Sequence, residues 1–174
     1  TMAKTYSLTH NHNENVKYSK LSHNHFNKIN RHPHKKYAYY SLAIAYNNIG
    51  NFNKSEAIYN ELIDSAKINC DTTFLVDVLE SYSNLLWYSR NFNQAKLIFK
   101  SIQKNYNKAL SVASTAHLAD IYTIENNQDS ASYYLSLAKL NASCNKDSIA
   151  IMIANYDYAF ANEDYKKAIN FQQE

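Results

Sequence analysis

Apolar residues follow a helical period in the stretch 37–64. In its first half they recur at positions i, i+3, i+4 and i+7, namely Tyr39, Leu42, Ala43 and Tyr46. This spacing gathers them on one face of a helix with 3.6 residues per turn. We therefore expect an amphipathic helix in the first half of the stretch.

A turn and a second amphipathic helix follow. Gly50 suits the left-handed conformation that closes a helix, and Asn51 can cap the next helix by accepting a backbone N–H. The second helix carries four large apolar side chains, Phe52, Ile58, Tyr59 and Leu62. Ser55 is small enough to let two helix axes approach closely. The stretch is thus predicted to form two helices folded back on each other.

The same pattern recurs along the chain at intervals of about 40 and then about 36 residues. The second copy contains Leu79, Tyr82, Ser83 and Leu86, then Phe92, Ala95, Phe99 and Ile102. The third contains Leu118, Ala119 and Tyr122, then Ala131, Leu135 and Ala138. A partial fourth contains Tyr156 and Ala159, then Tyr165 and Ala168.

This arrangement resembles the tetratricopeptide repeat. In the first helix of that repeat, a large residue is followed by Leu, a small residue and Tyr, and here these are Tyr39, Leu42, Ala43 and Tyr46. The turn of the repeat carries Gly and then an aromatic residue, and here these are Gly50 and Phe52. The small residue of the second helix falls on Ser55, where Ala is usual. No Pro closes the unit, and the spacings exceed the usual figure of about 34 residues. The resemblance covers residues 35–174 and implies an all-α fold, a right-handed α-solenoid of antiparallel helix pairs.

The expected organisation has two parts. Residues 1–34 form a basic, His-rich helical segment or degenerate repeat, and residues 35–174 form four helix pairs, at 35–70, 72–107, 109–142 and 146–174. A non-repetitive helical bundle is the alternative. With one Gly and one Pro in 174 residues, a turn-rich all-β fold is disfavoured.

The opening segment differs from the rest in charge. Residues 1–36 hold six of the seven His and seven Lys or Arg against one acid, Glu14, so the net charge of +3 averages two unlike pieces. The remainder is slightly acidic, and no strongly basic surface for nucleic acid follows. A loose apolar stripe predicts a helix from Asn13 to Asn30, formed by Val16, Leu21, His25, Phe26 and Ile29.

Histidines occur in three H-x-H pairs, which invites a metal hypothesis: His10 and His12, His23 and His25, His32 and His34. On a helix, residues i and i+2 point roughly 200° apart, whereas metal-binding pairs usually stand at i and i+4. The segment also has no Cys and one carboxylate. We expect no metal and no other cofactor, and keep a metal-responsive segment as an alternative.

Catalytic motifs are missing from the sequence. It has no Gly-rich phosphate loop, nucleophile elbow, C-x-x-C or H-E-x-x-H. His117 near Asp120 could be a base with its orienting acid, but no nucleophile can be assigned, and a groove-facing polar role is favoured. Asp157, Glu163 and Asp164 are interpreted as solvent-exposed or helix-start charges. We expect no enzyme.

The chain has no apolar run near the roughly 18 residues of a membrane helix. Cys70 and Cys144 lie two repeats apart, too far for a disulfide in a solenoid. Because the sequence begins at Thr1 and ends inside a predicted helix, we expect a piece of a longer protein. The sequence does not determine the compartment, since the cytoplasm and the periplasmic face of a bacterial envelope protein are both compatible with it. It does not determine the oligomeric state either.

The resemblance implies a concave groove lined by the first helix of each pair. The residues that it assigns there are Tyr37, Tyr40, Asn47, Asn48, Asp77, Glu80, Asn84, Trp87, Tyr88, Ala116, Asp120 and Thr123. Aromatic rings, amides and carboxylates suit a neutral or basic peptide. The Lys, Asn and Arg clamp with which some members grip a C-terminal carboxylate is absent.

The predicted function is a non-enzymatic scaffold that binds a peptide or partner protein, as a module of a larger sensor or regulatory protein of bacterial style. Nucleic-acid binding by a similar helical-repeat array is the rival from another class. Asp77, Glu80 and Asp120, with no Arg beside them in the expected groove, argue against it.

Overall fold

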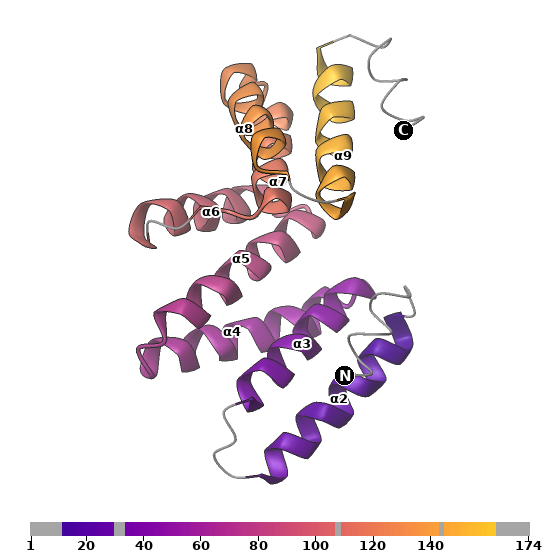
Figure 1. Cartoon of the computed structure of the whole chain (residues 1–174), viewed down its shortest axis with the longest axis vertical. Coiled ribbons are helices and arrows are strands. Elements are labelled where there is room, and N and C mark those ends of the chain that lie inside the picture. The colour runs from indigo at the N-terminus through magenta and orange to yellow at the C-terminus, as the bar shows by residue number, and fades with distance from the viewer. Residues whose placement is uncertain (1–11, 30–33, 107–108, 143–144, 163–174) are drawn as a thin grey trace. The chain divides into compact units, whose positions relative to one another are not determined.

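The protein is built from helices, as the computed structural model shows for residues 12–29, 34–106, 109–142 and 145–162 (Figure 1). Every helix or strand assigned in these ranges is an α-helix, so the predicted all-α class is confirmed. The chain divides into two compact units, Thr1–Leu85 and Leu86–Glu174. Their boundary falls inside α5 (Thr72–Tyr88).

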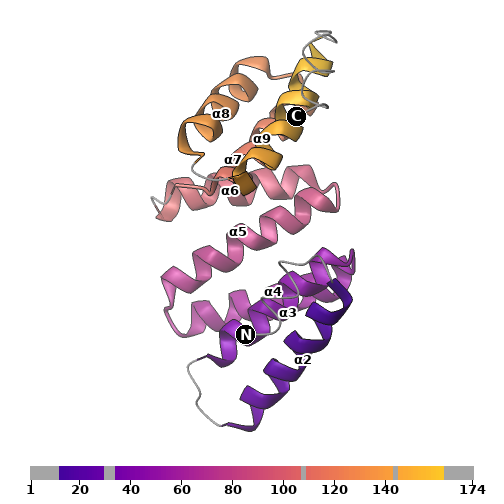
Figure 2. The ribbon, with the colours of Figure 1, turned by 45° about the vertical axis from the view of Figure 1, so that its right-hand side comes forward.

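The first unit contains α2 (His12–Lys28), α3 (Lys35–Asn48), α4 (Phe52–Ile68) and most of α5. Helix α3 packs against both α2 and α4 (Figure 2). The buried face of α2 carries Asn15, Val16 and Ser19. Leu21 is 55% exposed and Ile29 is 41% exposed. His25 is exposed as well, so the predicted apolar stripe is wrong at three positions, and Val16 is the one member of it that is buried.

The turn between α3 and α4 forms as predicted. Gly50 adopts a φ of 72°, which is the left-handed region that glycine enters without steric cost. The Lys54 N–H donates to Asn51 Oδ1 at 3.4 Å and so caps α4. Ser55 is fully buried, and its hydroxyl donates to the Ala43 carbonyl at 2.7 Å. The small residue thus permits a close crossing of α3 and α4 and adds a hydrogen bond to it.

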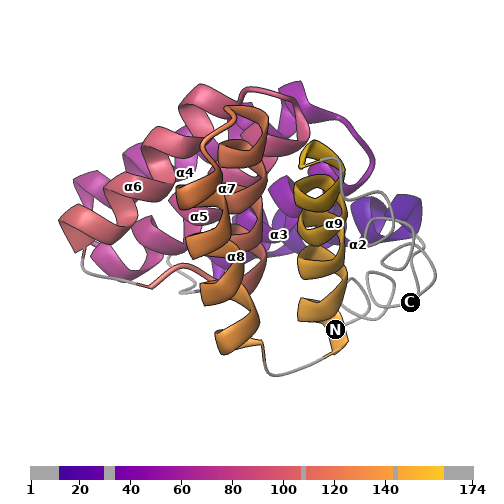
Figure 3. The ribbon, with the colours of Figure 1, turned by 90° about the horizontal axis from the view of Figure 1, so that it is seen from above.

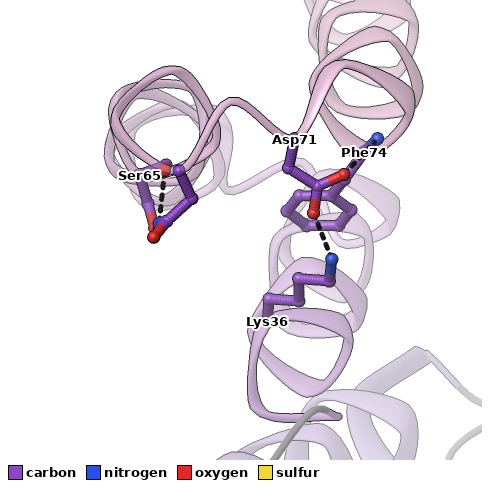
Figure 4. A network of polar contacts seen from close by, with 5 residues as sticks. Lys36, Ser65, Asp71 and Phe74 are labelled. Atoms are coloured by element: carbon purple, nitrogen blue, oxygen red, sulfur yellow. Dashed lines mark hydrogen bonds and ion pairs between the residues drawn. The ribbon is translucent and has the colours of Figure 1, made fainter.

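Asp71 organises the start of α5 (Figure 4). Its Oδ1 accepts the Phe74 N–H at 3.2 Å, and its other oxygen pairs with Lys36 of α3. The Lys36 ammonium also lies 4.8 Å from the centre of the Phe74 ring. The carboxylate thereby caps one helix and links it to another.

The second unit contains α6 (Phe92–Tyr106), α7 (Val112–Ile124), α8 (Gln128–Asn141) and α9 (Asn145–Ala161). Helix α7 contacts both α8 and α9 (Figure 3). Every residue from Ser114 to Thr123 is buried, so this helix is the centre of the unit. A cluster of buried apolar side chains joins these helices, formed by Ala116, Ala119, Leu135, Ala138, Ile151 and Ala154.

Three further turns use a left-handed residue other than glycine. Cys70 has a φ of 53°, Arg90 of 66° and Asn126 of 57°. Asn tolerates this conformation better than most side chains, whereas Cys and Arg are unusual there. Each residue follows the end of a helix, where one left-handed residue commonly closes the last turn.

Parts of the sequence prediction fall on residues outside the described ranges. Helix α9 is described, whereas Tyr165 and Ala168 of the predicted partner helix lie outside. Cys144 is also outside, and Cys70 is a free, exposed thiol. None of the described helices combines the length and the apolar character needed to span a bilayer.

Ala131 is the small residue of α8 predicted to lie at a helix crossing, and it is 1% exposed. Ala131→Leu should therefore overpack the contact and lower the free energy of unfolding by about 1–3 kcal/mol. Urea denaturation measures this loss. Ser136→Leu, which adds leucine on the exposed side of the same helix, serves as the control and should change stability little. Equal stability of the two variants would contradict the packing.

Candidate functional site

The groove residues predicted from the sequence fall in both units. Seven lie in the first unit: Tyr37, Tyr40, Asn47, Asn48, Asp77, Glu80 and Asn84. Five lie in the second: Trp87, Tyr88, Ala116, Asp120 and Thr123. Their role in binding stays a prediction, and their environments differ between the two units.

In the first unit, Tyr40 has a packing role. Its hydroxyl lies 2.5 Å from Ser81 Oγ and donates to the Asp77 carbonyl at 3.3 Å, so it links α3 to α5. Burial raises the pKa of Tyr40. Tyr37 is 48% exposed and presents its ring edge-on to Phe74. Tyr40 is therefore held inside the helix layer, whereas the ring of Tyr37 stays accessible.

The amide and acidic candidates of the first unit are spread over two helices. Asn47 and Asn48 lie at the end of α3. Asn48 is exposed, whereas Asn47 is half-buried and its Oδ1 lacks a hydrogen-bond partner. Asp77, Glu80 and Asn84 are half-buried along α5.

In the second unit, Trp87 at the end of α5 is bound to α7 by two contacts. Its indole stacks on the His117 ring, with centroids 3.9 Å apart and planes inclined by 13°. Its Nε1–H donates to Asp120 Oδ2 at 2.8 Å. Tyr88 meets both rings edge-on, at 5.0 Å from Trp87 and 5.6 Å from His117. These side chains form a rigid aromatic wall.

That wall borders a pocket of about 650 Å³, here named the Trp87 pocket. Its apolar and aromatic lining consists of Trp87, Tyr88, Phe92, Ile124, Ile153 and Ala161. Its polar lining consists of Arg90, Asp120, Thr123, Asn126 and Asp157. Four of the predicted groove residues, Trp87, Tyr88, Asp120 and Thr123, thus line one pocket. Ala116 is buried beside a smaller void that Trp87 and His117 also line.

Two carboxyl groups meet in the Trp87 pocket, Asp120 from α7 and Asp157 from α9. Burial is the main cause that raises the pKa of Asp120, to about 6, and burial also raises the pKa of Asp157. A hydrogen bond between the carboxyls raises the pKa of Asp120 further and lowers that of Asp157. Asp120 is therefore the partner that holds the proton.

Asp157 and Arg90 are the charged pocket residues that the sequence did not predict, and Arg90 overturns the expectation that no Arg stands beside Asp120. The uncharged residues that were not predicted are Ile124, Asn126, Ile153 and Ala161. The interpretation of Asp157 as a solvent or helix-start charge is wrong, because it lies half-buried near the end of α9. Glu163 and Asp164 lie outside the described ranges. A signal was present in the sequence, since Asp157 follows Asp120 by about one repeat length. The sequence did not indicate that Arg90 lines the pocket, because its position there depends on the left-handed turn that it occupies.

His117 is buried, and this burial lowers its pKa from 6.5 to about 4. The imidazole is therefore neutral near pH 7. Its stacking on Trp87 makes it part of the aromatic wall, so it supports the pocket rather than facing a groove.

These pKa shifts predict opposite effects on stability. The unfolded state takes up the His117 proton between pH 6.5 and about 4, so this group makes stability rise with pH across that window. The folded state holds the Asp120 proton between pH 3.8 and about 6, so this group makes stability fall with pH. As the pH falls from 6.5 to 4, we expect His117→Asn to lose less stability than the parent does, and Asp120→Asn to lose more.

Urea midpoints at several pH values between about 4 and 7 measure these slopes. Ser136→Asn, a substitution without a titrating group on the exposed side of α8, is the control and should follow the parent. Parallel pH profiles for the parent, His117→Asn and Asp120→Asn would show that neither group is perturbed.

Two histidines of the H-x-H pairs, His23 and His25, lie on α2 beside aromatic rings. His23 stacks on Tyr39 at 4.3 Å, and its Nε2 lies 2.8 Å from Asn27 Nδ2. His25 is exposed and approaches Phe26 edge-on. Among the residues described, no three His, Cys, Asp or Glu side chains gather to hold a metal ion. His10 and His32 lie outside this part of the chain.

Comparison by sequence finds no matching family model and no matching curated protein. Comparison by structure finds TPR-like repeats. A crystal structure of nearly identical TPR-like repeats, from a Podosopora anserina protein named as a kinesin light chain, superimposes with a TM-score of 0.67 at 14% identity. The match covers 99% of this chain and 89% of that one. A single-substitution variant of the same repeats gives a TM-score of 0.68 at 14% identity, covering 99% and 88%. By its fold, this chain is a TPR-like helical-repeat protein.

Proposed function

We propose that this chain is a protein-interaction module that binds a polypeptide segment in the Trp87 pocket and does not transform it chemically. The observation that carries the proposal is the composition of that pocket. Rigid aromatic rings and exposed aliphatic side chains surround a few polar groups within about 650 Å³. This is the usual composition of a site that holds an anchoring side chain of a partner.

Three exposed apolar residues at this pocket support the proposal. Tyr88 is 52% exposed, Ile124 48% and Ile153 45%. They come from three helices, α5, α7 and α9. A partner that covered them would gain about 25 cal/mol of free energy per Å² of apolar surface buried, before the costs of association are subtracted. The shared TPR-like fold adds support at the level of analogy, because that fold commonly presents surfaces to other proteins.

The charges of the Trp87 pocket favour a polypeptide over a nucleic acid. Its lining holds two carboxyl groups and one guanidinium, Arg90. Phosphate contacts depend on clustered positive charge, and the affinity that they supply falls steeply with salt. We therefore expect single-stranded RNA to bind weakly at physiological salt.

A selection from a random peptide library displayed on phage tests the proposal. We expect selected peptides, remade with blocked ends, to bind in calorimetry and to change Trp87 fluorescence. A single-stranded RNA of mixed sequence should do neither at the same salt. Tyr133→Ala, which removes an exposed ring of α8 away from the pocket lining, should bind the peptides like the parent. A selection that yields no binding peptide, or tight RNA binding with quenching of Trp87, would refute the proposed function.

A further inference from the structure

The two carboxyl groups of the Trp87 pocket form no ion pair within the described part of the chain. Asp120 is 5% exposed and Asp157 is half-buried. Ion pairs between described residues, such as those of Lys36 with Asp71 and of Lys96 with Glu125, involve other acids. Buried carboxylates are ordinarily paired or neutralised. In this pocket Asp120 accepts the Trp87 indole N–H at 2.8 Å, and burial together with the neighbouring Asp157 raises its pKa.

Arg90 lies in the same pocket without pairing to either acid. Its guanidinium carbon is 5.8 Å from the centre of the Phe92 ring, and no carboxylate oxygen of a described residue comes within ion-pair distance of it. Its charge lowers the pKa of both acids through space. The carboxyl pair therefore faces the pocket with its negative charge only partly offset.

The walls of the pocket around the carboxyl pair suit a long cationic side chain. Trp87 and Tyr88 offer ring surfaces that attract a cation. Ile124 and Ile153 offer aliphatic contact for a methylene stem. A lysine or arginine side chain combines such a stem with a head group that donates hydrogen bonds to carboxylates.

We infer that the partner polypeptide inserts a lysine or arginine side chain into the Trp87 pocket, with its cationic head at Asp120 and Asp157 and its stem between Tyr88, Ile124 and Ile153. This inference rests on the proposed function and specifies its partner. A neutral anchor would leave the negative charge of the carboxyl pair offset only by Arg90, and an acidic anchor would place a further anion beside it.

Binding of such a cation should release the proton that Asp120 holds. The groups facing Asp120 are Trp87 and Tyr88 from α5, Arg90 from the following turn, His117 from α7 and Asp157 from α9. His117 is uncharged above about pH 4, and Arg90 keeps its charge throughout. The proton on Asp120 is therefore the one that the bound cation displaces, and affinity should rise as the pH increases from about 5 to 7.

A positional peptide library gives the test. Blocked peptides with a degenerate background carry one fixed central residue: lysine, arginine, norleucine, citrulline or glutamate. We expect the lysine and arginine sets to bind about tenfold or more tightly than their neutral isosteres norleucine and citrulline. Asp157→Asn should reduce this preference to less than about threefold, whereas Asp129→Asn, an exposed acid of α8, should preserve it. Circular dichroism of both variants checks that they remain folded.

The outcomes separate the two proposals. Binding with equal affinity for charged and neutral sets, or a preference for glutamate that Arg90→Gln abolishes, would overturn the cationic anchor and leave polypeptide binding intact. A lysine preference that survives Asp157→Asn and Asp120→Asn would also overturn it. Failure of every set to bind the parent would reject both proposals together.

Discussion

Leu135→Ala should lower the free energy of unfolding by about 2–5 kcal/mol. Leu135 is 5% exposed and packs in the apolar cluster where α7, α8 and α9 meet. Its neighbours there include Ala116, Ala119 and Ala138. Because alanines cannot extend to fill the space of a missing leucine, the cavity should persist, and the loss should fall in the upper half of that range.

Urea denaturation followed by helical circular dichroism measures this effect. Leu140→Ala is the matched control on the same helix, since Leu140 is 82% exposed, and it should change stability by less than about 0.5 kcal/mol. Similar losses for the two variants would mean that α8 presents a different face to α7 and α9.

Trp87→Ala should weaken binding of the library-selected peptides by about 2–4 kcal/mol. The indole is the largest ring that lines the Trp87 pocket, and its N–H orients Asp120. Loss of the ring should remove apolar surface that the peptide contacts, and loss of the N–H should leave the buried Asp120 carboxyl group with one hydrogen-bond partner fewer.

Trp87→Phe is the companion variant, because it retains a ring to stack on His117 and loses the indole donor. It should weaken binding less than Trp87→Ala does. Unfolding of both variants, with parent-like affinity in any fraction that stays folded, would assign Trp87 to packing alone.

The helices could be predicted from the sequence because their apolar residues recur in phase. Gly50, Asn51 and Ser55 were interpreted correctly, since a turn glycine, a capping amide and a small crossing residue act within a few positions of one another. The burial of Ala95 and Ala131 also follows from the pattern, and both are at most 1% exposed.

The N-terminal helix shows where periodicity fails. Its buried residues include Asn15 and Ser19, whose side chains lie 3.5 Å apart, whereas the larger Leu21 is exposed. Hydrophobic patterning gives such small polar residues no weight. The left-handed Cys70, Arg90 and Asn126 were equally hidden, because only one turn of this chain carries the glycine that marks such a position.

The Trp87 pocket could be predicted only in part. The sequence pattern assigns both Trp87 and Asp120 to the predicted groove, but it does not reveal that Trp87 donates a hydrogen bond to Asp120. Asp120 on α7 and Asp157 on α9 line the same pocket, although the whole of α8 separates them in the sequence. The pKa values of this pair depend on burial and on an adjacent like charge, which are properties of the folded unit.

The most direct test of polypeptide binding in the Trp87 pocket uses the only tryptophan of the chain. Its indole N–H gives a single, assignable cross-peak in a ¹H–¹⁵N correlation spectrum, and that N–H is bonded to Asp120 inside the pocket. Titration with a library-selected peptide should move this cross-peak saturably, with the dissociation constant that calorimetry gives. A peptide that binds at that affinity while the indole cross-peak stays in place would contradict the account.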